Sequence, residues 1–215
     1  MTYGVTLTAP SGEMWVTPDS IPLALYSKQE IVLRGGTNDD EFRAVTYDQS
    51  KPMIAFVCFT NGQAKANTVY NGNECRVAFS YGSQQARAEI YFFTIFPQPK
   101  PDYGLAIWDA SGTIVLTDKT RTLTDVQSYG EGYDINVTNS GKWAVSPLAL
   151  GLVVGVVSDP MPRPFQGEYH AYAIFNGSST NIRGMVTQIP GGNISGVTYL
   201  NMRNYCLAIE CSKYD

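Results

Sequence analysis

Cysteine and histidine are the residue types of this chain that most readily carry nucleophilic or metal chemistry. The four cysteines include no C-x-x-C pair, and His170 is the single histidine. They are Cys58, Cys75, Cys206 and Cys211. A structural zinc site needs four such ligands at close spacing, and a nucleophile needs a neighbouring base. We therefore expect free buried thiols, no metal site, and a histidine in an apolar strand whose hydrogen-bonding groups are satisfied.

Acidic and glycine-rich segments offer the remaining chemistry. The segment 38–41, Asn-Asp-Asp-Glu, lacks the alternating carboxylates of a calcium loop and predicts a solvated turn. The segment 191–196 lacks the G-x-S-x-G spacing, and Gly35-Gly36 is not followed by Gly-Lys-Ser or Gly-Lys-Thr. Two carboxylates across a groove can hydrolyse polysaccharide, but enzymes that degrade surface polysaccharide are usually much longer repeat proteins. We expect no catalytic residues, no metal and no cofactor.

Aromatic side chains suggest binding rather than catalysis. Trp15, Trp108 and Trp143, with 14 tyrosines, could stack on sugar rings. If Leu105 and Ile107 face the core, Trp108 points outward. An outward tryptophan indicates an interface or a ligand platform, and we favour the interface.

Composition sets the class of protein that must position these residues. The chain has 215 residues, 44% of them apolar and 16% charged, with a net charge of −4. These values exclude disorder, coiled coil and collagen, and the absence of a Lys/Arg run argues against nucleic acid as a partner. The most apolar window, 144–157, is too short for a membrane span, and no signal peptide is evident at residue 1, so we expect neither membrane insertion nor classical secretion.

The chain contains an internal repeat at an offset of 100 residues. Tyr3-Gly4-Val5 matches Tyr103-Gly104-Leu105, and Ser11-Gly12 matches Ser111-Gly112. At an offset near 115, segments 54–62 and 89–96 resemble 170–177 and 204–211. We therefore predict a duplication. It comprises an N-terminal β domain at 1–97, a Pro-rich linker at 98–102, and a C-terminal β domain at 103–215 with an insertion around 140–168.

The local patterns predict strands throughout. Two-residue alternation is frequent, no long amphipathic helix pattern occurs, and turns at 71–72 and 190–192 indicate hairpins. We predict an all-β fold of two tandem β-sandwich-like domains. Segments 53–59 and 90–96 are apolar on both faces, so their second face must be covered by the other domain or another subunit. The prolines of 159–165 predict an extended loop or edge excursion that offers Met161 and Phe165 to a partner.

The pattern from Tyr103 to Asp118, repeated more weakly from Tyr3, resembles the opening of small β-rich proteins of tailed bacteriophages. These proteins are typically encoded among tail-tip and tail-fibre genes, and the likeness covers about 20 residues in each half. The resemblance implies a virion structural component at the distal tail, with a role in tip assembly or host attachment. It brings no catalytic residues. The missing export signal fits a protein made in the bacterial cytoplasm.

A duplicated chain also suggests a symmetric assembly. Three copies would present six similar faces to a sixfold tail tube, so a trimer is favoured over a hexamer. Other virion tail proteins are the expected partners, with a host surface glycan or receptor as a further one. The candidate interface residues are Trp108, Met161 and Phe165. The rival interpretations are a carbohydrate-binding β-sandwich adhesin and a cryptic polysaccharide hydrolase.

Overall fold

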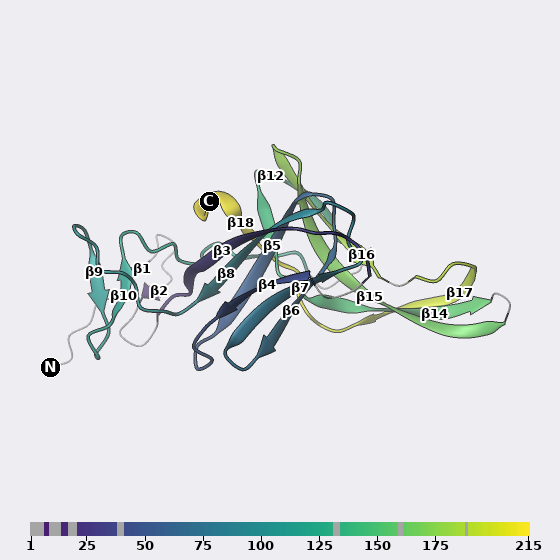
Figure 1. The fold of residues 1–215 in the computed structure, drawn as a ribbon, viewed down its shortest axis with the longest axis horizontal. Helices are drawn as coiled ribbons and strands as arrows, with labels where there is room; N and C mark the ends of the chain where they lie inside the picture. The colour runs from purple at the N-terminus through teal and green to yellow at the C-terminus, as the bar shows by residue number, and fades with distance from the viewer. Residues whose placement is uncertain are drawn as a thin grey trace.

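A computed structural model describes residues 7–8, 14–16, 21–37, 41–130, 134–158, 161–187 and 189–215, the first two ranges as backbone only. In these ranges the chain forms eighteen β-strands and one 3-10 turn at Cys211–Lys213, with no α-helix (Figure 1). The predicted all-β class is therefore confirmed, and the sheets are arranged as in a β-sandwich. The predicted turn at 38–41 falls largely on 38–40, which lie outside the described residues.

Eight strands come from the first half of the chain. They are β1 (Leu7–Thr8), β2 (Met14–Val16), β3 (Ala24–Val32), β4 (Glu41–Thr46), β5 (Met53–Asn61), β6 (Lys65–Asn71), β7 (Glu74–Ser80) and β8 (Arg87–Thr94). Strands β3, β8 and β5 pair antiparallel in one sheet, and β4, β7 and β6 pair antiparallel in another. An Asn-Gly turn with Gly72 at φ +57° joins β6 to β7, as the sequence predicts.

The first core lies between these two sheets, where the alternate residues of both point inward. Its larger side chains are Ile31, Leu33, Val57, Phe59, Val77, Phe79, Ile90 and Phe92, all buried. Tyr172, from the second half of the chain, completes this core.

Ten strands come from the second half. They are β9 (Ala106–Trp108), β10 (Ile114–Thr117), β11 (Gln127–Ser128), β12 (Asn136–Ser140), β13 (Trp143–Val145), β14 (Ala149–Ser158), β15 (Pro162–Phe175), β16 (Ser179–Val186), β17 (Asn193–Asn201) and β18 (Leu207–Glu210). Strands β11, β18, β13, β5, β15, β14 and β17 follow one another in one large sheet, to which β3, β8, β12 and β16 also belong.

That sheet crosses the predicted domain boundary. β13 bridges to β5 at Val145 and Val57, and β15 runs parallel to β5 at Ile174 and Phe59. The segment around Arg121 also bonds to the edge of β3. The predicted linker at 98–102 therefore does not separate two self-contained sheets.

The reason lies in the double-sided strands β5 and β8. Their second face, which carries Phe56 and Phe93, is buried against residues that follow the boundary. Those residues are Ala144, Ile209, Cys211 and Tyr214. We expected either the other domain or another subunit to cover this face, and in the structure the second half of the same chain covers it.

The repeat at an offset of 100 is visible in two hairpins. In β1–β2, Leu7 pairs with Val16, and in β9–β10, Ile107 pairs with Leu116. Beyond these hairpins the pairing of the two halves differs. β16 pairs with β12 and β15, whereas β17 pairs with β14, so the predicted hairpin across 190–192 is wrong. The wider duplication stays a prediction.

Strands β14 and β17 and residues 162–168 of β15 form a three-stranded arm that projects from the body of the molecule (Figure 1). Pro162 pairs with Ser158 and Pro164 with Val156, so this part of 159–165 is a strand. Of the two predicted alternatives, the loop is wrong and the edge position is correct, because β15 meets β16 only from Tyr169 onward. Before that residue one side of β15 is open, and prolines are tolerated on an edge.

Candidate functional site

The three predicted interface residues do not form one surface. Trp108 lies on β9 and is 54% exposed at one end of the molecule, but Leu105, which the prediction placed in the core, is 52% exposed as well. Met161 is 72% exposed at the tip of the arm, at the other end (Figure 1). Phe165 is partly buried because its ring lies over Gly155 on the neighbouring strand. Trp143 donates to the Ser140 carbonyl and packs against a further core cluster, formed within the second half by residues such as Leu150 and Ile182. Trp15 falls where only the backbone is described.

His170 is a buried strand residue, as expected, but it belongs to a charged cluster. Its Nε2 lies 3.0 Å from Glu168 Oε2, which also accepts from Lys65 Nζ at 2.9 Å. The expectation of a satisfied ring is wrong for Nδ1, which is buried and has no hydrogen-bond partner among the described residues. Burial outweighs the carboxylate and lowers the pKa of His170, while the Lys65 ammonium lowers the pKa of Glu168. The cluster joins β6 to β15.

A second charged cluster joins the end of the chain to β3 and β8. Lys28 and Lys142 each contact Glu89 and Asp215, at distances of 2.5 to 3.0 Å. The Tyr91 hydroxyl lies 2.7 Å from Glu89 Oε2 and 2.8 Å from Asp215 Oδ1, within donating distance of both carboxylates. Burial alone would raise the pKa of Glu89, but hydrogen bonds from Tyr91 and both lysines lower it. Each of the four charged side chains contacts two of opposite sign, so the cluster holds β3, β8, Lys142 and Asp215 together.

The four cysteines are free and buried, as expected. Burial raises the pKa of Cys75, Cys206 and Cys211 to about 12, and raises the pKa of Cys58 as well. Thiolates are the nucleophilic form of cysteine. At neutral pH these side chains therefore act as small apolar groups of the core.

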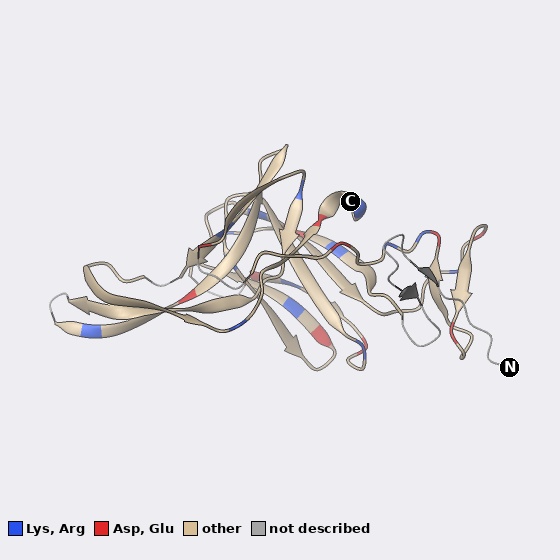
Figure 2. Cartoon of the chain, turned by 180° about the vertical axis from the view of Figure 1, so that it is seen from behind, with Lys and Arg blue, Asp and Glu red and all other residues tan. Residues whose placement is uncertain are grey.

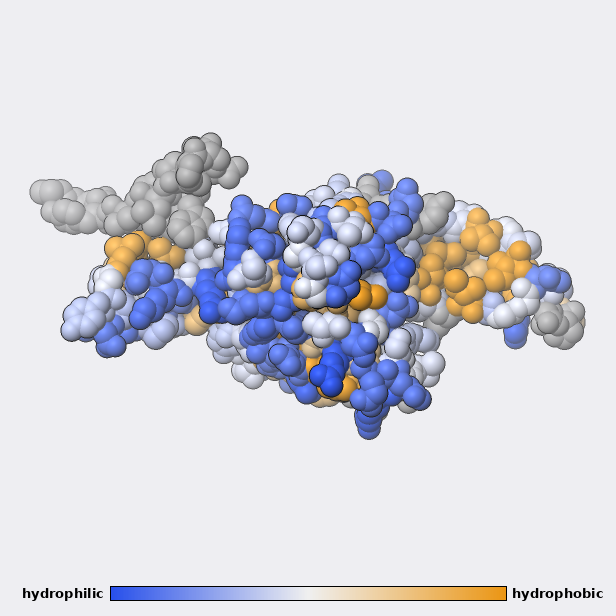
Figure 3. Space-filling model, turned by 90° about the horizontal axis from the view of Figure 1, so that it is seen from above, coloured by the Kyte–Doolittle hydropathy of each residue, from blue (hydrophilic) through white to orange (hydrophobic). Residues whose placement is uncertain are grey.

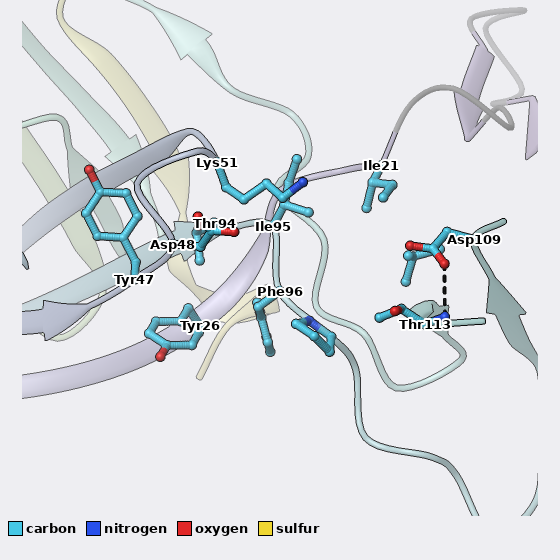
Figure 4. A pocket seen from close by; sticks show the side chains of 12 residues that line it. Ile21, Tyr26, Tyr47, Asp48, Lys51, Thr94, Ile95, Phe96, Asp109 and Thr113 are labelled. Carbon is cyan, nitrogen blue, oxygen red and sulfur yellow. Dashed lines mark hydrogen bonds between the residues drawn. The ribbon is translucent and has the colours of Figure 1, made fainter. Parts of the chain in front are cut away.

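A cleft of about 470 Å³ lies between the sandwich and the β9–β10 hairpin (Figure 4). The sandwich contributes the start of β3, the turn between β4 and β5, and the chain after β8. The cleft is lined by Ile21, Tyr26, Tyr47, Asp48, Lys51, Thr94, Ile95, Phe96, Pro97, Asp109, Thr113 and Val115. Sequence reasoning missed this site because its members come from four segments, and Trp108 is not among them.

The aromatic part of the cleft is rigidly held. The Tyr26 ring packs edge to face on Phe96, with ring centres 5.0 Å apart. Its hydroxyl donates to the Thr46 carbonyl at 3.0 Å, which restrains the ring in the lining of the cleft. Tyr47 packs in the same manner on Tyr70.

The polar part of the cleft comes from two turns that face each other. In the hairpin turn, Asp109 Oδ1 accepts from the backbone N–H groups of Ser111 and Thr113, both at 2.9 Å. In the β4–β5 turn, the Asp48 carboxylate accepts from the Ser50 N–H. The Ser50 N–H lowers the pKa of Asp48, and the Ser111 hydroxyl together with the backbone N–H groups lowers the pKa of Asp109, so both carboxyls are ionised at neutral pH. Lys51 is exposed and forms no ion pair with another described residue.

The arm is the most apolar exposed surface that the views show (Figure 3). Charged residues are spread over the body but are nearly missing from the arm, where β14 and β17 have none (Figure 2). The exposed apolar side chains on the arm and its flanks are Met161, Ile189, Ile194, Val197, Leu200 and Met202. A patch of this kind marks an interaction surface.

The described residues contain no group of three His, Cys, Asp or Glu side chains placed to hold a metal ion. In the same residues no helix is long and apolar enough to cross a membrane. No family model, curated protein or solved structure matches this chain.

Proposed function

We propose that this chain is a non-enzymatic structural protein of a bacteriophage virion, a minor component of the tail tip that acts in tip assembly or host attachment. It is made in the bacterial cytoplasm and is incorporated into the tail. The observation that carries the proposal is the projecting apolar arm, because such a surface is covered when a protein is part of an assembly.

The outer edge of the arm supports this role. β17 is the last strand of the large sheet, and its nine residues include no charge and no proline. Its one irregularity is a bulge at Gly196, where φ is +60°. Soluble proteins usually protect such an edge with lysine or proline, because an open edge pairs with strands of other chains. The opposite edge, with Pro162, Arg163 and Pro164, has that protection.

The partners of this role are other tail proteins and further copies of the chain, in a trimer by preference. The hairpins β1–β2 and β9–β10 support a symmetric arrangement, because they repeat one register within a single chain. Two similar elements per chain let three chains contact a sixfold tube at six equivalent places.

Peptide mass spectrometry on density-purified particles tests the proposal. We expect a few copies of the chain per particle, counted against a major tail protein. A Val197→Lys variant, which places a charge on the open edge, should be depleted from particles at least tenfold. Val126→Lys is the matched control, since Val126 is also exposed but lies outside the arm. Intact particles without the wild-type chain would remove the proposal.

The second candidate function is that of a carbohydrate-binding adhesin. The observation that favours it is the cleft beside the β9–β10 hairpin, where aromatic rings and paired polar groups line one hollow. Trp108, the tryptophan expected to stack on a sugar, lies outside that lining. Glycan binding that is lost in Trp108→Ala but kept in cleft variants would therefore argue for a different surface.

A further inference from the structure

We propose that the cleft between the sandwich and the β9–β10 hairpin is a binding site for a neutral glycan, with room for one or two sugar units. The inference deepens the host-attachment part of the proposed function. It rests on that function only for the source of the glycan, since binding by the isolated chain does not require a virion.

The size of the cleft suits a small ligand. Its volume of about 470 Å³ falls within the range of roughly 300 to 1,000 Å³ that is usual for ligand pockets. Figure 4 shows side chains from the sandwich on one side and from the hairpin on the other. A ligand here would contact both, so it would also hold the hairpin against the body.

The apolar surface has the form that a sugar ring requires. Pyranose rings have flat C–H faces, which pack on the faces and edges of aromatic side chains. Tyr26 and Phe96 present such a surface, and Ile95 lies beside them (Figure 4). The hydrogen bond from Tyr26 to Thr46 holds the platform in place before a ligand arrives, so little side-chain entropy is lost on binding.

The polar groups match the hydroxyls of a sugar. Three hydrogen bonds of the turn end on Asp109 Oδ1, and the carboxylate has a second acceptor oxygen, Oδ2. An ionised carboxylate accepts only, and the Lys51 ammonium donates only. Neighbouring hydroxyls on one sugar can do both, so a vicinal diol is able to donate to a carboxylate while it accepts from the lysine.

The charge balance selects among sugars. The lining contains two carboxylates, Asp48 and Asp109, and one ammonium, Lys51. Both carboxyls are ionised at neutral pH, so the site has a net charge of minus one. A uronic or sialic acid would be repelled, whereas a neutral hexose would not.

The test is titration of the purified full-length chain with hexasaccharides, followed by calorimetry and saturation-transfer NMR. Maltohexaose, cellohexaose, chitohexaose and β-1,4-galactohexaose are the neutral probes, and hexagalacturonate is the acidic one. We expect saturable binding of at least one neutral probe and at least tenfold weaker binding of the acidic probe.

Variants assign the binding to the cleft. Lys51→Met should weaken binding of the neutral probe at least tenfold, while Lys119→Met, an exposed lysine outside the lining, should leave it unchanged. The double variant Asp48→Asn with Asp109→Asn keeps acceptors for both turns and should reduce the discrimination against hexagalacturonate at least fivefold. Asp118→Asn is its control. Thermal unfolding of each variant checks that the chain is folded.

Three results would overturn the proposal. They are a folded chain that binds none of the neutral probes, binding that Lys51→Met leaves unchanged, and a preference for hexagalacturonate. Val197→Lys separates this proposal from the assembly role, since it alters the arm and should leave glycan binding as in the wild type. A wild-type chain that binds glycan but is absent from particles would contradict only the proposed particle role. A wild-type chain that is present in particles but binds no glycan would contradict only the proposed role of the cleft.

Discussion

His170 is buried in a strand, as predicted, but its charged neighbours Glu168 and Lys65 were not predicted. Its position in an apolar strand predicts burial, and the structure confirms it. The ion pair of Lys65 with Glu168 beside it was not predictable, because these residues are about 100 positions apart and meet only where β6 approaches β15. A pattern within one strand carries no information about which charged side chain lies across from it.

The lowered pKa of His170 makes stability depend on pH. The neutral ring favours the folded state, and this contribution is fully present above the unfolded pKa, near 6.5. As pH falls through the lower pKa of the folded state, the unfolded chain takes up the proton first and stability is lost. Urea unfolding from pH 8 to pH 5 should show a loss of up to about 1.4 kcal/mol per pH unit below pH 6.5.

In His170→Gln this slope should largely vanish. The remaining loss should then begin at lower pH, where Glu168 is protonated, because the pKa of that carboxyl is also lowered in the folded state. An unchanged slope between pH 6.5 and pH 5 in the variant would show that another group controls the dependence.

At the scale of elements, the strands were largely predictable and their partners were not. The two-faced apolar pattern of β5 and β8 requires a cover on each side, and both covers exist. Strand identity depends on local alternation, whereas pairing depends on residues far along the chain. For the same reason β17 pairs with β14 rather than β16, and the cleft, built from four separate segments, had no signal in the sequence.

The cover on the second face of β8 depends on the last residues of the chain. Tyr214 is 1% exposed, its ring packs 4.9 Å from that of Phe93, and its hydroxyl accepts from the Thr124 N–H. Tyr214→Ala should therefore lower the free energy of unfolding by about 3 to 5 kcal/mol, measured from the urea midpoint. Tyr205→Ala, at a tyrosine that is 52% exposed, should change it by less than about 1 kcal/mol. Equal losses in the two variants would contradict the packing role.

At the scale of the whole molecule, the two halves share one sheet and parts of the core. The repeat predicts two similar domains, and in the hairpins the similarity is real. The large sheet and two of the core clusters nevertheless combine residues from both sides of 98–102. Similarity between segments gives no information about whether each segment buries its own apolar surface.

A fragment of residues 1–97 should therefore fail to fold alone. It would expose the face of β5 and β8 that carries Phe56 and Phe93, so we expect no cooperative urea transition and strong binding of an apolar dye. Addition of residues 103–215, expressed separately, should restore the transition. Cooperative unfolding of the first fragment by itself would show that the shared sheet is dispensable.

The residues that cover the second face of β8 are synthesised long after β8 itself, and this delay affects folding during synthesis. Tyr214 is about 120 residues further along the chain than Thr94, the last residue of β8. At a synthesis rate of about 5 to 20 residues per second, it leaves the ribosome on the order of ten seconds later. During that time two aromatic strands have one bare face and can join those of neighbouring nascent chains. Production in quantity should therefore depend on chaperones that hold the first half until the second half arrives.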